Sequence, residues 1–292
     1  MSYQNILNPI QLKELAKSWI NEDLSSFDMQ ALVCDDKEVR AVILCKSDGV
    51  LAGVPFANAI FNELDCRVNW LTKEGDNISL NGQKSGSVQI AYVDGKARSV
   101  LLAERVVLNV LSRCSGVATQ ARQLRQSLQT IGWKGMIAGT RKTTPGFRTV
   151  EKYGLLIGGV SPHRYDLSTM VMLKDNHIVI SGSVKAAISA VRSVGDFVPK
   201  IEVECRNPEE AEEAAQLGAD IIMLDNFDDQ LLLQTAQHIK SQHKDCLIEA
   251  SGGINPDNVH KFANQWIDII SMSCLVQGYP TVDYSMKIQK SL

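Results

Sequence analysis

The chain has 292 residues, a formal net charge of −3 and 45% hydrophobic residues. That length suits one large barrel or two domains with substantial cores, and the composition is that of a globular protein. The charge argues against nonspecific nucleic-acid binding, which needs a basic face over many residues. An anion site must therefore be a local concentration of cations.

The seven cysteines are scattered along the chain, and no two have C-x-x-C spacing. Most lie in apolar runs, so we expect reduced core residues in a reducing compartment and no structural zinc. The first 20 residues lack the pattern of a secretory signal, and no apolar stretch approaches the roughly 20 residues that span a bilayer. We expect a cytoplasmic protein, with the nucleus as a further location.

In chain order, residues 8–24 are predicted to form a helix, because Ile10, Leu12, Leu15, Ile20 and Leu24 recur at mostly helical intervals. Between about 30 and 100, short runs rich in β-branched residues predict a small sheet, with Gly, Asp and Asn separating ALVCDD, KEVRAVILCK, GVLAGVPF, CRVNWLTKEG and GSVQIAYVDG. Residues 101–128 suit one long helix, or two joined near Ser115-Gly116.

After Gly132 the pattern changes to strand, loop and helix. The compact apolar runs are GMIAGT (135–140), LLIGG (155–159), MVMLKDN (170–176), KIEVEC (200–205), DIIMLDN (220–226), CLIEAS (246–251) and DIISMS (268–273). Helical stretches such as SVKAAISAVRSV and NPEEAEEAAQLG lie between them, which is typical of parallel strands buried on both faces. We predict an incomplete β/α barrel in residues 116–275, after an N-terminal α/β domain in residues 1–115 with which residues 276–292 pack.

Polar residues follow every predicted barrel strand. In a β/α barrel the C-terminal ends of the strands form the site, so these residues are expected at one mouth. They are Arg141-Lys142, His163-Arg164, Lys174-Asp175-Asn176-His177, Glu204, Asp225-Asn226, Ser251-Gly252-Gly253 and Ser273. Any one of them is easily explained as a solvated loop or turn residue, but the whole set is not.

The charges at this mouth indicate the ligand. Four cations, contributed by Arg141, Lys142, Arg164 and Lys174, suit a substrate with several carboxylates or phosphates. The carboxylates of Glu204 and Asp225 would repel such a substrate unless Mg²⁺ lies between them. Ser251, Gly252 and Gly253 supply backbone N–H groups where barrels often hold a phosphate. These features predict a barrel enzyme for a small polyanion, but they do not identify its reaction.

Seven ordered motifs resemble the quinolinate phosphoribosyltransferase family, in its eukaryotic branch. They are LAERVVLNVLSRCSG (102–116), GTRKTTPGFRTVEKYG (139–154), GG-x-x-x-HR (158–164), LKDNH (173–177), EVE (202–204), LDN (224–226) and EASGGI (249–254). The resemblance covers nearly the whole chain. It implies an N-terminal α/β sandwich with an open α/β barrel, the fold of type II phosphoribosyltransferases. It also implies phosphoribosyl transfer from 5-phosphoribosyl 1-diphosphate to quinolinate, with release of carbon dioxide and diphosphate, in de novo NAD synthesis.

The resemblance also implies roles for single residues. Quinolinate would be held by cationic and imidazole side chains, namely Arg105, Arg141, His163, Arg164 and Lys174. Lys142 and Lys174 approach the donor, Glu204 and Asp225 lie near the ribose hydroxyls and Mg²⁺, and Ser251, Gly252 and Gly253 match the 5′-phosphate loop. Lys142, Glu204 and Asp225 are the catalytic candidates, and Thr140 and Ser273 complete the set. Arg105 would reach the site of a neighbouring subunit in a dimer-based homo-oligomer, expected to be a hexamer.

Two positions depart from the family pattern. Ser273 stands where the family often has Gly, and Ser161-Pro162 stands where many members have Asn before the His. Outside the site, Arg148, Glu151 and Lys152 have the i, i+3, i+4 spacing of an ion-pair set on a helix surface. His177 either braces its loop or contacts substrate, and the sequence favours neither.

Other functions remain open at this stage. A related phosphoribosyltransferase for another aromatic acid fits the same features. A barrel lyase with Lys142 or Lys174 as a Schiff base is disfavoured, because both lysines have polar neighbours rather than an apolar pocket. A noncatalytic protein that binds a phosphorylated metabolite would use the same cations.

Overall fold

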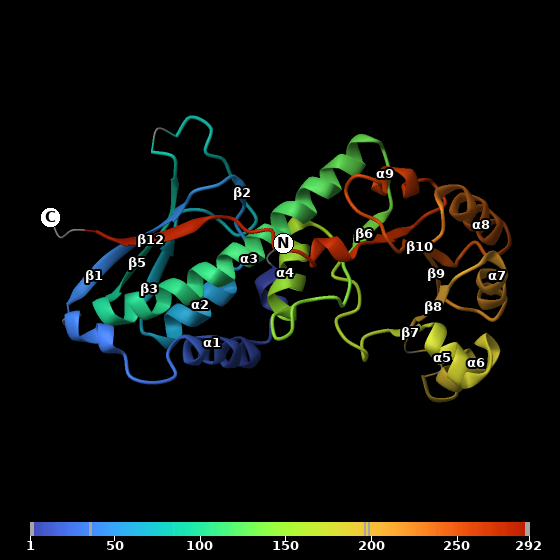
Figure 1. Cartoon of the computed structure of the whole chain (residues 1–292), viewed down its shortest axis with the longest axis horizontal. Helices are drawn as coiled ribbons and strands as arrows, with labels where there is room; N and C mark the ends of the chain where they lie inside the picture. Colours follow the sequence, from blue (N-terminus) through green and yellow to red (C-terminus); the bar gives the residue numbers. More distant parts are fainter. Residues whose placement is uncertain (1–2, 35–36, 84, 196, 198, 290–292) are drawn as a thin grey trace. The chain divides into compact units, whose positions relative to one another are not determined.

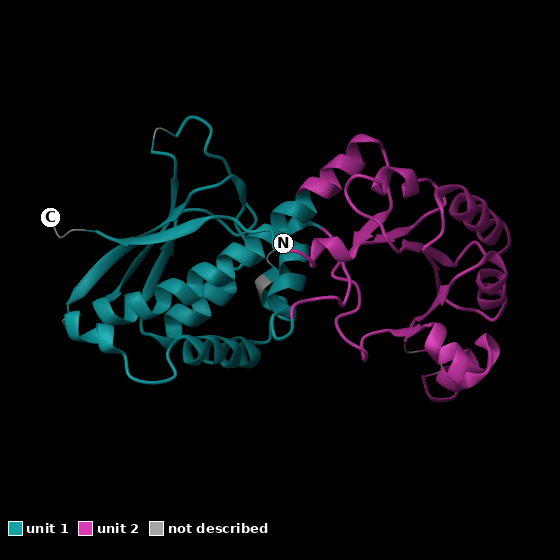
Figure 2. Cartoon of the chain, in the orientation of Figure 1, with its two compact units in different colours: residues 1–122, 145–159, 279–292 teal, residues 123–144, 160–278 magenta. Residues whose placement is uncertain are grey.

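The computed structural model describes residues 3–34, 37–83, 85–195, 197 and 199–289. The chain divides into two compact units, which Figure 2 distinguishes by colour. Unit 1 comprises Met1–Arg122, Pro145–Gly159 and Tyr279–Leu292, and unit 2 comprises Gln123–Thr144 and Val160–Gly278. The sequence led us to expect one boundary near residue 115; the division falls at Arg122, and a second segment, 145–159, belongs to unit 1.

Unit 1 is built on a four-stranded antiparallel sheet in the order β12-β1-β5-β3 (Figure 1). The strands are β1 (Glu38–Cys45), β3 (Arg67–Trp70), β5 (Val88–Lys96) and β12 (Tyr284–Ile288), and a separate two-stranded sheet joins β2 (Gly49–Val50) to β4 (Asn77–Ile78). β12 brings the C-terminal part of the chain back to the edge of this sheet, where Cys45 pairs with Tyr284.

The helices of unit 1 complete a two-layer α/β sandwich. They are α1 (Pro9–Asp23), α2 (Val54–Glu63), the first part of α3 (Ala97–Thr130) and α4 (Arg148–Gly158), with 3-10 turns η1 (Tyr3–Ile6) and η2 (Met29–Val33). Ile43 and Ile90 of the sheet share one buried cluster with Phe56, Ile60 and Leu111 of the helices. Apolar burial between one sheet face and the helices thus holds this unit together.

The predicted strand GVLAGVPF is mostly wrong. Only Gly49–Val50 is extended, and α2 begins at Val54. Gly53, at φ +106°, lets the chain turn into the helix, and Pro55 is tolerated in the first turn, where its missing N–H is not needed. Phe56 and Ile60 then lie one turn apart, so they bury on one helix face.

Helix α3 is a single helix of 34 residues, so the first of the two alternatives for residues 101–128 is correct. Gly116 does not break it. A Cβ atom there would lie only 2.7 Å from the Cα of Thr281, so the glycine serves a close approach of the segment that leads to β12.

The predicted strand 155–159 is also wrong, because these residues belong to α4. A short apolar run fits a buried helix as well as a strand. Gly154 and Gly158 are spaced by one turn and face α3, where a Cβ on Gly154 would lie 3.1 Å from the Cβ of Val117. Close helix–helix packing therefore selects the helix.

The same packing corrects the predicted surface ion pairs of α4. Glu151 and Lys152 are buried, at 0% and 2% exposure. Both Nε and a terminal nitrogen of Arg113, on α3, donate to Glu151 Oε1, at 2.9 and 2.8 Å. This pair is internal to unit 1, and the periodicity of charges alone does not distinguish it from a solvated one.

Unit 2 contains a parallel six-stranded sheet in the order β6-β11-β10-β9-β8-β7. The strands are β6 (Met136–Ala138), β7 (Val171–Leu173), β8 (Ile201–Cys205), β9 (Ile221–Asp225), β10 (Leu247–Ser251) and β11 (Ile269–Ser271). The helices are α5 (Asp175–Ser181), α6 (Val184–Gly195), α7 (Pro208–Gln216), α8 (Asp229–Gln242) and α9 (Val259–Phe262), with 3-10 turn η3 (Ser273–Leu275). Among the described strands, β6 and β7 form the two edges of a curved, open barrel (Figure 1), as the sequence predicted.

All seven cysteines lie in the described ranges and carry free thiols, as expected. Within those ranges, no single helix has the length and apolar character of a membrane span. The bent pair α5–α6 meets that criterion by length and composition only.

Candidate functional site

Alternation along the parallel strands of unit 2 directs one set of side chains into the barrel. Residues two positions apart on a strand face the same side, and parallel strands present their carboxyl ends at one edge. The inward pairs at that end are Met172 and Lys174, Glu202 and Glu204, Met223 and Asp225, and Glu249 and Ser251. The strand register therefore gathers the polar strand ends around one opening.

A cavity of about 460 Å³ opens there, lined only by unit 2. Its lining includes twelve of the residues predicted from the sequence: Thr140, Arg141, Lys142, His163, Arg164, Lys174, Glu204, Asp225, Ser251, Gly252, Gly253 and Ser273. It also includes Asn226, which the sequence placed at this mouth, and residues that the sequence did not single out: Gly139, Met172, Met223, Glu249, Ile254 and Ser271. Arg105 belongs to unit 1, where it lies exposed on α3.

His163 and Arg164 reach this cavity although no strand precedes them. After α4 ends, Ser161 forms an isolated parallel bridge with Ala138 of β6, which aligns the segment with the barrel. His163 then adopts φ +57°, an uncommon value for a residue with a side chain, and its N–H donates to Ser161 Oγ at 3.2 Å. The bridge between Ser161 and Ala138 thus lies after residues 155–159, the segment predicted to be a strand.

The cationic part of the lining contains an unsatisfied donor. Arg141 Nε is buried and has no hydrogen-bond partner among the described residues. The Arg164 guanidinium has long contacts to Met170 O at 3.5 Å and to Met172 Sδ at 3.3 Å. Arg141 and Arg164 both line the cavity, and burial and then the charge of Arg141 lower the pKa of Arg164. Neighbouring half-buried cations of this kind favour an anion between them.

The acidic part of the lining is paired with polar neighbours. Lys174 Nζ donates to Glu204 Oε2, and Asn226 Nδ2 donates to Asp225 Oδ2 at 2.6 Å. Burial and then the charge of Glu204 raise the pKa of Asp225. The carboxylates of Asp225 and Glu204 therefore repel each other, and a divalent cation bound between them would remove this repulsion.

The loop after β10 has the backbone of an anion-binding turn. Gly252 and Gly253 adopt φ +90° and +63°, values that favour glycine. Asn226 N–H donates to Ser251 O at 3.0 Å, and Ser271 Oγ donates to Ser251 Oγ at 3.1 Å. Such a loop leaves its own N–H groups to a phosphate.

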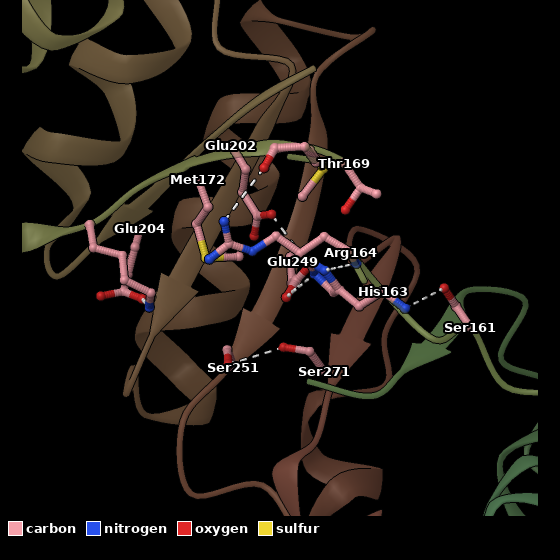
Figure 3. Close-up of polar contacts among 12 residues, drawn as sticks. Ser161, His163, Arg164, Thr169, Met172, Glu202, Glu204, Glu249, Ser251 and Ser271 are labelled. Atoms are coloured by element: carbon pink, nitrogen blue, oxygen red, sulfur yellow. Dashed lines mark hydrogen bonds and ion pairs between the residues drawn. The ribbon is translucent and has the colours of Figure 1, made fainter. Parts of the chain in front are cut away.

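The floor of the site holds His163 against two buried glutamates (Figure 3). Its Nε2 lies 3.0 and 3.3 Å from the two carboxylate oxygens of Glu249 and 3.8 Å from Glu202 Oε2. Both glutamates are 0% exposed. Burial and then the charge of Glu249 raise the pKa of Glu202, so its carboxyl group favours the neutral form.

His177 lies at the start of α5. Its Nδ1 accepts the N–H of Lys174 at 3.0 Å, and Lys174 O accepts the N–H of His177 at 2.8 Å. It does not line the cavity. Of the two alternatives for this residue, the structure shows the bracing contact.

The open parallel barrel, the cationic cavity and the glycine loop define an enzyme of the type II phosphoribosyltransferase fold that acts on small polyanions. Comparisons with known proteins identify it further. Residues 27–115 match the family model of the quinolinate phosphoribosyl transferase N-terminal domain, and residues 117–287 match the C-terminal domain model. The chain belongs to the quinolinate phosphoribosyltransferase family.

Individual relatives agree over nearly their whole length. The chain is 46% identical over 283 residues to the human nicotinate-nucleotide pyrophosphorylase [carboxylating], covering 97% of this chain and 93% of the relative. It is 44% identical to that of Dictyostelium discoideum, covering 99% and 100%. The solved nicotinate-nucleotide pyrophosphorylase from Francisella tularensis is 27% identical with a TM-score of 0.88, covering 99% of this chain and 100% of that one.

Proposed function

We propose that this chain is a decarboxylating quinolinate phosphoribosyltransferase that supplies nicotinate mononucleotide for NAD synthesis. The observation that carries the proposal is the cavity in unit 2, where the basic side chains that hold a diacid in this family stand beside a phosphate-type glycine loop. Family membership over both domains supports the same reaction.

In the acceptor half of the site, Arg141 and Arg164 bind the two carboxylates of quinolinate. The orphaned Nε of Arg141 supports this role, because a buried donor without a partner costs free energy that an anion recovers. Lys174 completes the clamp, and to do so it exchanges part of its contact with Glu204 for the substrate. Three cations around one dianion fix the ring with its nitrogen toward the donor.

In the donor half, the loop Ser251–Gly253 and the hydroxyl of Ser273 bind the 5′-phosphate of 5-phosphoribosyl 1-diphosphate, and Thr140 lines the same space. The carboxylates of Glu204 and Asp225 accept hydrogen bonds from the ribose hydroxyl groups. The mutual repulsion of these two carboxylates fits a shared Mg²⁺, which they would hold together with substrate oxygens. When bound, this ion supplies charge neutralisation for the diphosphate.

The reaction then needs no covalent enzyme intermediate. The ring nitrogen of quinolinate forms a bond to C1 of the ribose as the bond from C1 to diphosphate breaks. Lys142 stabilises the negative charge on the leaving diphosphate, while Glu204 and Asp225 stabilise the positive charge that develops on the ribose. The carboxylate beside the now cationic nitrogen leaves as carbon dioxide, its bonding electrons remain on the ring carbon, and a proton from water takes its place.

The site is completed by a second copy of the chain. Arg105 is exposed on α3 and does not line the cavity. In unit 1, Phe27 and Met29 lie beside Leu101 and Leu102, about one turn before Arg105 on α3, and Phe27, Met29, Leu32 and Val33 are exposed apolar side chains. We propose that this surface docks on the barrel mouth of a neighbouring subunit and inserts Arg105 there, within a dimer-based hexamer in the cytoplasm. Light scattering on the purified protein tests the assembly, which a monomeric mass would contradict.

The reaction is tested with quinolinate and, separately, nicotinate as the acceptor, each with 5-phosphoribosyl 1-diphosphate and Mg²⁺. Nicotinate mononucleotide, carbon dioxide and diphosphate should form in equal amounts from quinolinate. Product from nicotinate but not from quinolinate would show that the acceptor assignment is wrong. Diphosphate formation from neither acceptor would favour a binding protein.

A further inference from the structure

The imidazole of His163 has both of its nitrogens occupied by protein partners. The backbone N–H of Arg164 points at Nδ1, with 2.8 Å between the nitrogens, and Nε2 lies 3.0 Å from Glu249 Oε2. A backbone N–H can only donate, so Nδ1 must offer its lone pair. The ring proton therefore resides on Nε2 and is donated to Glu249.

This arrangement leaves no ring nitrogen for a ligand. A neutral imidazole has one donor and one acceptor, and here both are used. The His163 side chain is 9% exposed, and Glu249 is 0% exposed. Although the ring lines the cavity, both of its nitrogens are hydrogen-bonded to protein groups.

The neighbouring carboxylates invite a metal interpretation, because ligand atoms of His163, Glu202 and Glu249 lie within 4.8 Å of one another. The tautomer argues against it. An imidazole that binds a metal through one nitrogen normally donates the N–H of the other to an acceptor. Nδ1 of His163 faces a donor instead.

We propose that Glu249 is a positioning residue for quinolinate binding: it fixes the tautomer and orientation of His163, and His163 Nδ1 in turn anchors the backbone of Arg164. The inference rests on the proposed function only for the identity of the ligand. Its structural basis is the hydrogen-bonded chain Glu249–His163–Arg164 and the unusual backbone of His163, at φ +57°. A conformation of that kind persists only where its surroundings hold it.

Arg164 explains why such a support is useful. Its guanidinium lines the cavity together with that of Arg141, whose positive charge repels it. A bidentate arginine–carboxylate contact needs a fixed donor plane. The hydrogen bond from the Arg164 N–H to His163 Nδ1 constrains the backbone that carries this guanidinium.

The first test reads the tautomer directly, on the wild-type protein labelled with ¹⁵N-histidine and without substrate. Two-bond ¹H–¹⁵N spectra should show His163, assigned by its loss in His163→Gln, as the neutral Nε2–H tautomer. Glu249→Gln keeps an acceptor and should retain this tautomer, whereas Glu249→Ala should give a mixture. Glu202→Gln is the matched control, because Glu202 lies 3.8 Å away without a hydrogen bond and its change should leave the tautomer intact.

The second test measures quinolinate binding by calorimetry. Glu249→Ala should weaken it by about 10- to 100-fold, the scale of a lost charge-assisted hydrogen bond, while Glu249→Gln recovers most of the affinity. Donor binding should change less than about two-fold, because the hydrogen bonds described for His163 run to Ser161, Arg164 and Glu249 and not to the loop proposed to hold the donor. In a His163→Ala background, Glu249→Ala should have no further effect.

An Nδ1–H tautomer in the wild type, unchanged quinolinate affinity in Glu249→Ala, or additive losses in the double variant would each overturn the proposal. Thermal unfolding will show whether Glu249→Ala folds. If it does not, the spectra of Glu249→Gln and Glu202→Gln decide the role of Glu249: both variants should keep the Nε2–H tautomer of His163, and its loss in Glu202→Gln would overturn the proposal. If the wild type does not bind quinolinate at all, the proposed function fails, while the tautomer measurement still decides the role of Glu249.

Discussion

At the scale of single residues, Lys142 tests the electrostatic mechanism most directly. It is exposed at the cavity wall. Burial and Glu204 raise the pKa of Asp225, and the charge of Lys142 opposes that rise, so Lys142 acts on the acidic part of the site. Lys142→Ala should reduce turnover by roughly two to three orders of magnitude, the scale for removing a preorganised charge-stabilising group. Steady-state formation of nicotinate mononucleotide measures this effect.

Lys134→Ala is the matched control, because Lys134 is an exposed lysine of unit 2 that does not line the cavity. It should retain wild-type turnover. A Lys142→Ala enzyme with unimpaired turnover would show that the charge of Lys142 does not act on the leaving diphosphate.

The two glycines of the phosphate loop give a second prediction. A Cβ on Gly252 would lie 2.6 Å from the backbone N of Asn226, whereas one on Gly253 would meet nothing within 4 Å. Both substitutions carry the cost of a left-handed backbone, about 1–2 kcal/mol, but only Gly252→Ala must displace the loop or Asn226. Gly252→Ala should raise KM for the donor more than about ten-fold, and Gly253→Ala clearly less.

Steady-state kinetics with saturating quinolinate separates the two variants. Equal KM values for the donor would contradict the steric argument, because the backbone cost alone would then account for both.

The sequence could predict the polar residue at the end of each strand but not the inward-facing residue two positions earlier. Lys174, Glu204 and Asp225 line the cavity because barrel chemistry collects at strand ends. Glu249 was missed, although it stands two positions before Ser251 on β10 and so faces the same side. Applying the alternation rule one step further back along each strand would have found it.

At the scale of secondary-structure elements, Glu74 is the clearest case of a side chain that supports a helix from a distant loop. Its two carboxylate oxygens accept the N–H groups of Gly53 and Val54 at 2.9 and 3.1 Å, at the start of α2. Gly53 has no side chain to cap the helix itself, so the carboxylate takes that function.

Burial raises the pKa of Glu74 to about 7, against the opposing effect of those two N–H donors. A carboxyl group whose pKa is raised on folding stabilises the protein below its unfolded pKa, near 4.5, and this contribution is lost as pH rises through 7. The free energy of unfolding should therefore fall between pH 5 and 8, by up to about 1.4 kcal/mol per pH unit. Burial also raises the pKa of its neighbours Tyr153 and Cys114, so both stay neutral in this range.

Urea unfolding of the wild type and of Glu74→Gln, at several pH values in this range, measures the effect as the difference between the two proteins. As pH rises, the free energy of unfolding of the wild type should fall relative to that of Glu74→Gln, because glutamine does not titrate. A shift in the opposite direction would mean that the two N–H donors outweigh burial.

The elements that the sequence misassigned share one cause. Residues 155–159 form part of α4 because Gly154 and Gly158 let that helix approach α3 closely. Val54–Glu63 forms a helix because the φ of Gly53 and the distant carboxylate of Glu74 start it. In both segments the decisive contact is with a part of the chain far away in sequence, which local patterns of apolar residues do not contain.

At the scale of the whole molecule, the chain does not divide into two consecutive domains. α4 and β12 belong to unit 1, although the residues of unit 2 separate them from the rest of it in sequence. The antiparallel pairing of β12 with β1 explains the return of the C-terminal segment. The strand–helix pattern of the sequence predicts the barrel well, because each βα pair is local. The sequence also led us to expect residues 276–292 beside the first domain, but its local pattern did not show that α4 belongs to unit 1.

The proposed assembly leads to the final prediction. If Arg105 acts in the site of a neighbouring subunit, Arg105→Ala and Lys142→Ala chains should each be inactive alone and should restore activity when mixed. In a mixed dimer, the barrel of the Arg105→Ala chain retains Lys142 and receives Arg105 from the Lys142→Ala chain. Random exchange makes about half of the dimers mixed, with one intact site of two, so the unfractionated mixture should recover about a quarter of wild-type activity and purified mixed dimers about a half.

Differently tagged chains, refolded or exchanged together and purified through both tags, give verified mixed oligomers for this assay. Mixing Arg105→Ala with the Arg105→Ala/Lys142→Ala double variant is the control, since no combination of those chains rebuilds an intact site. If verified mixed oligomers stay inactive, Arg105 acts within its own chain or not at all, and the apolar surface of Phe27, Met29, Leu32 and Val33 must then have another function.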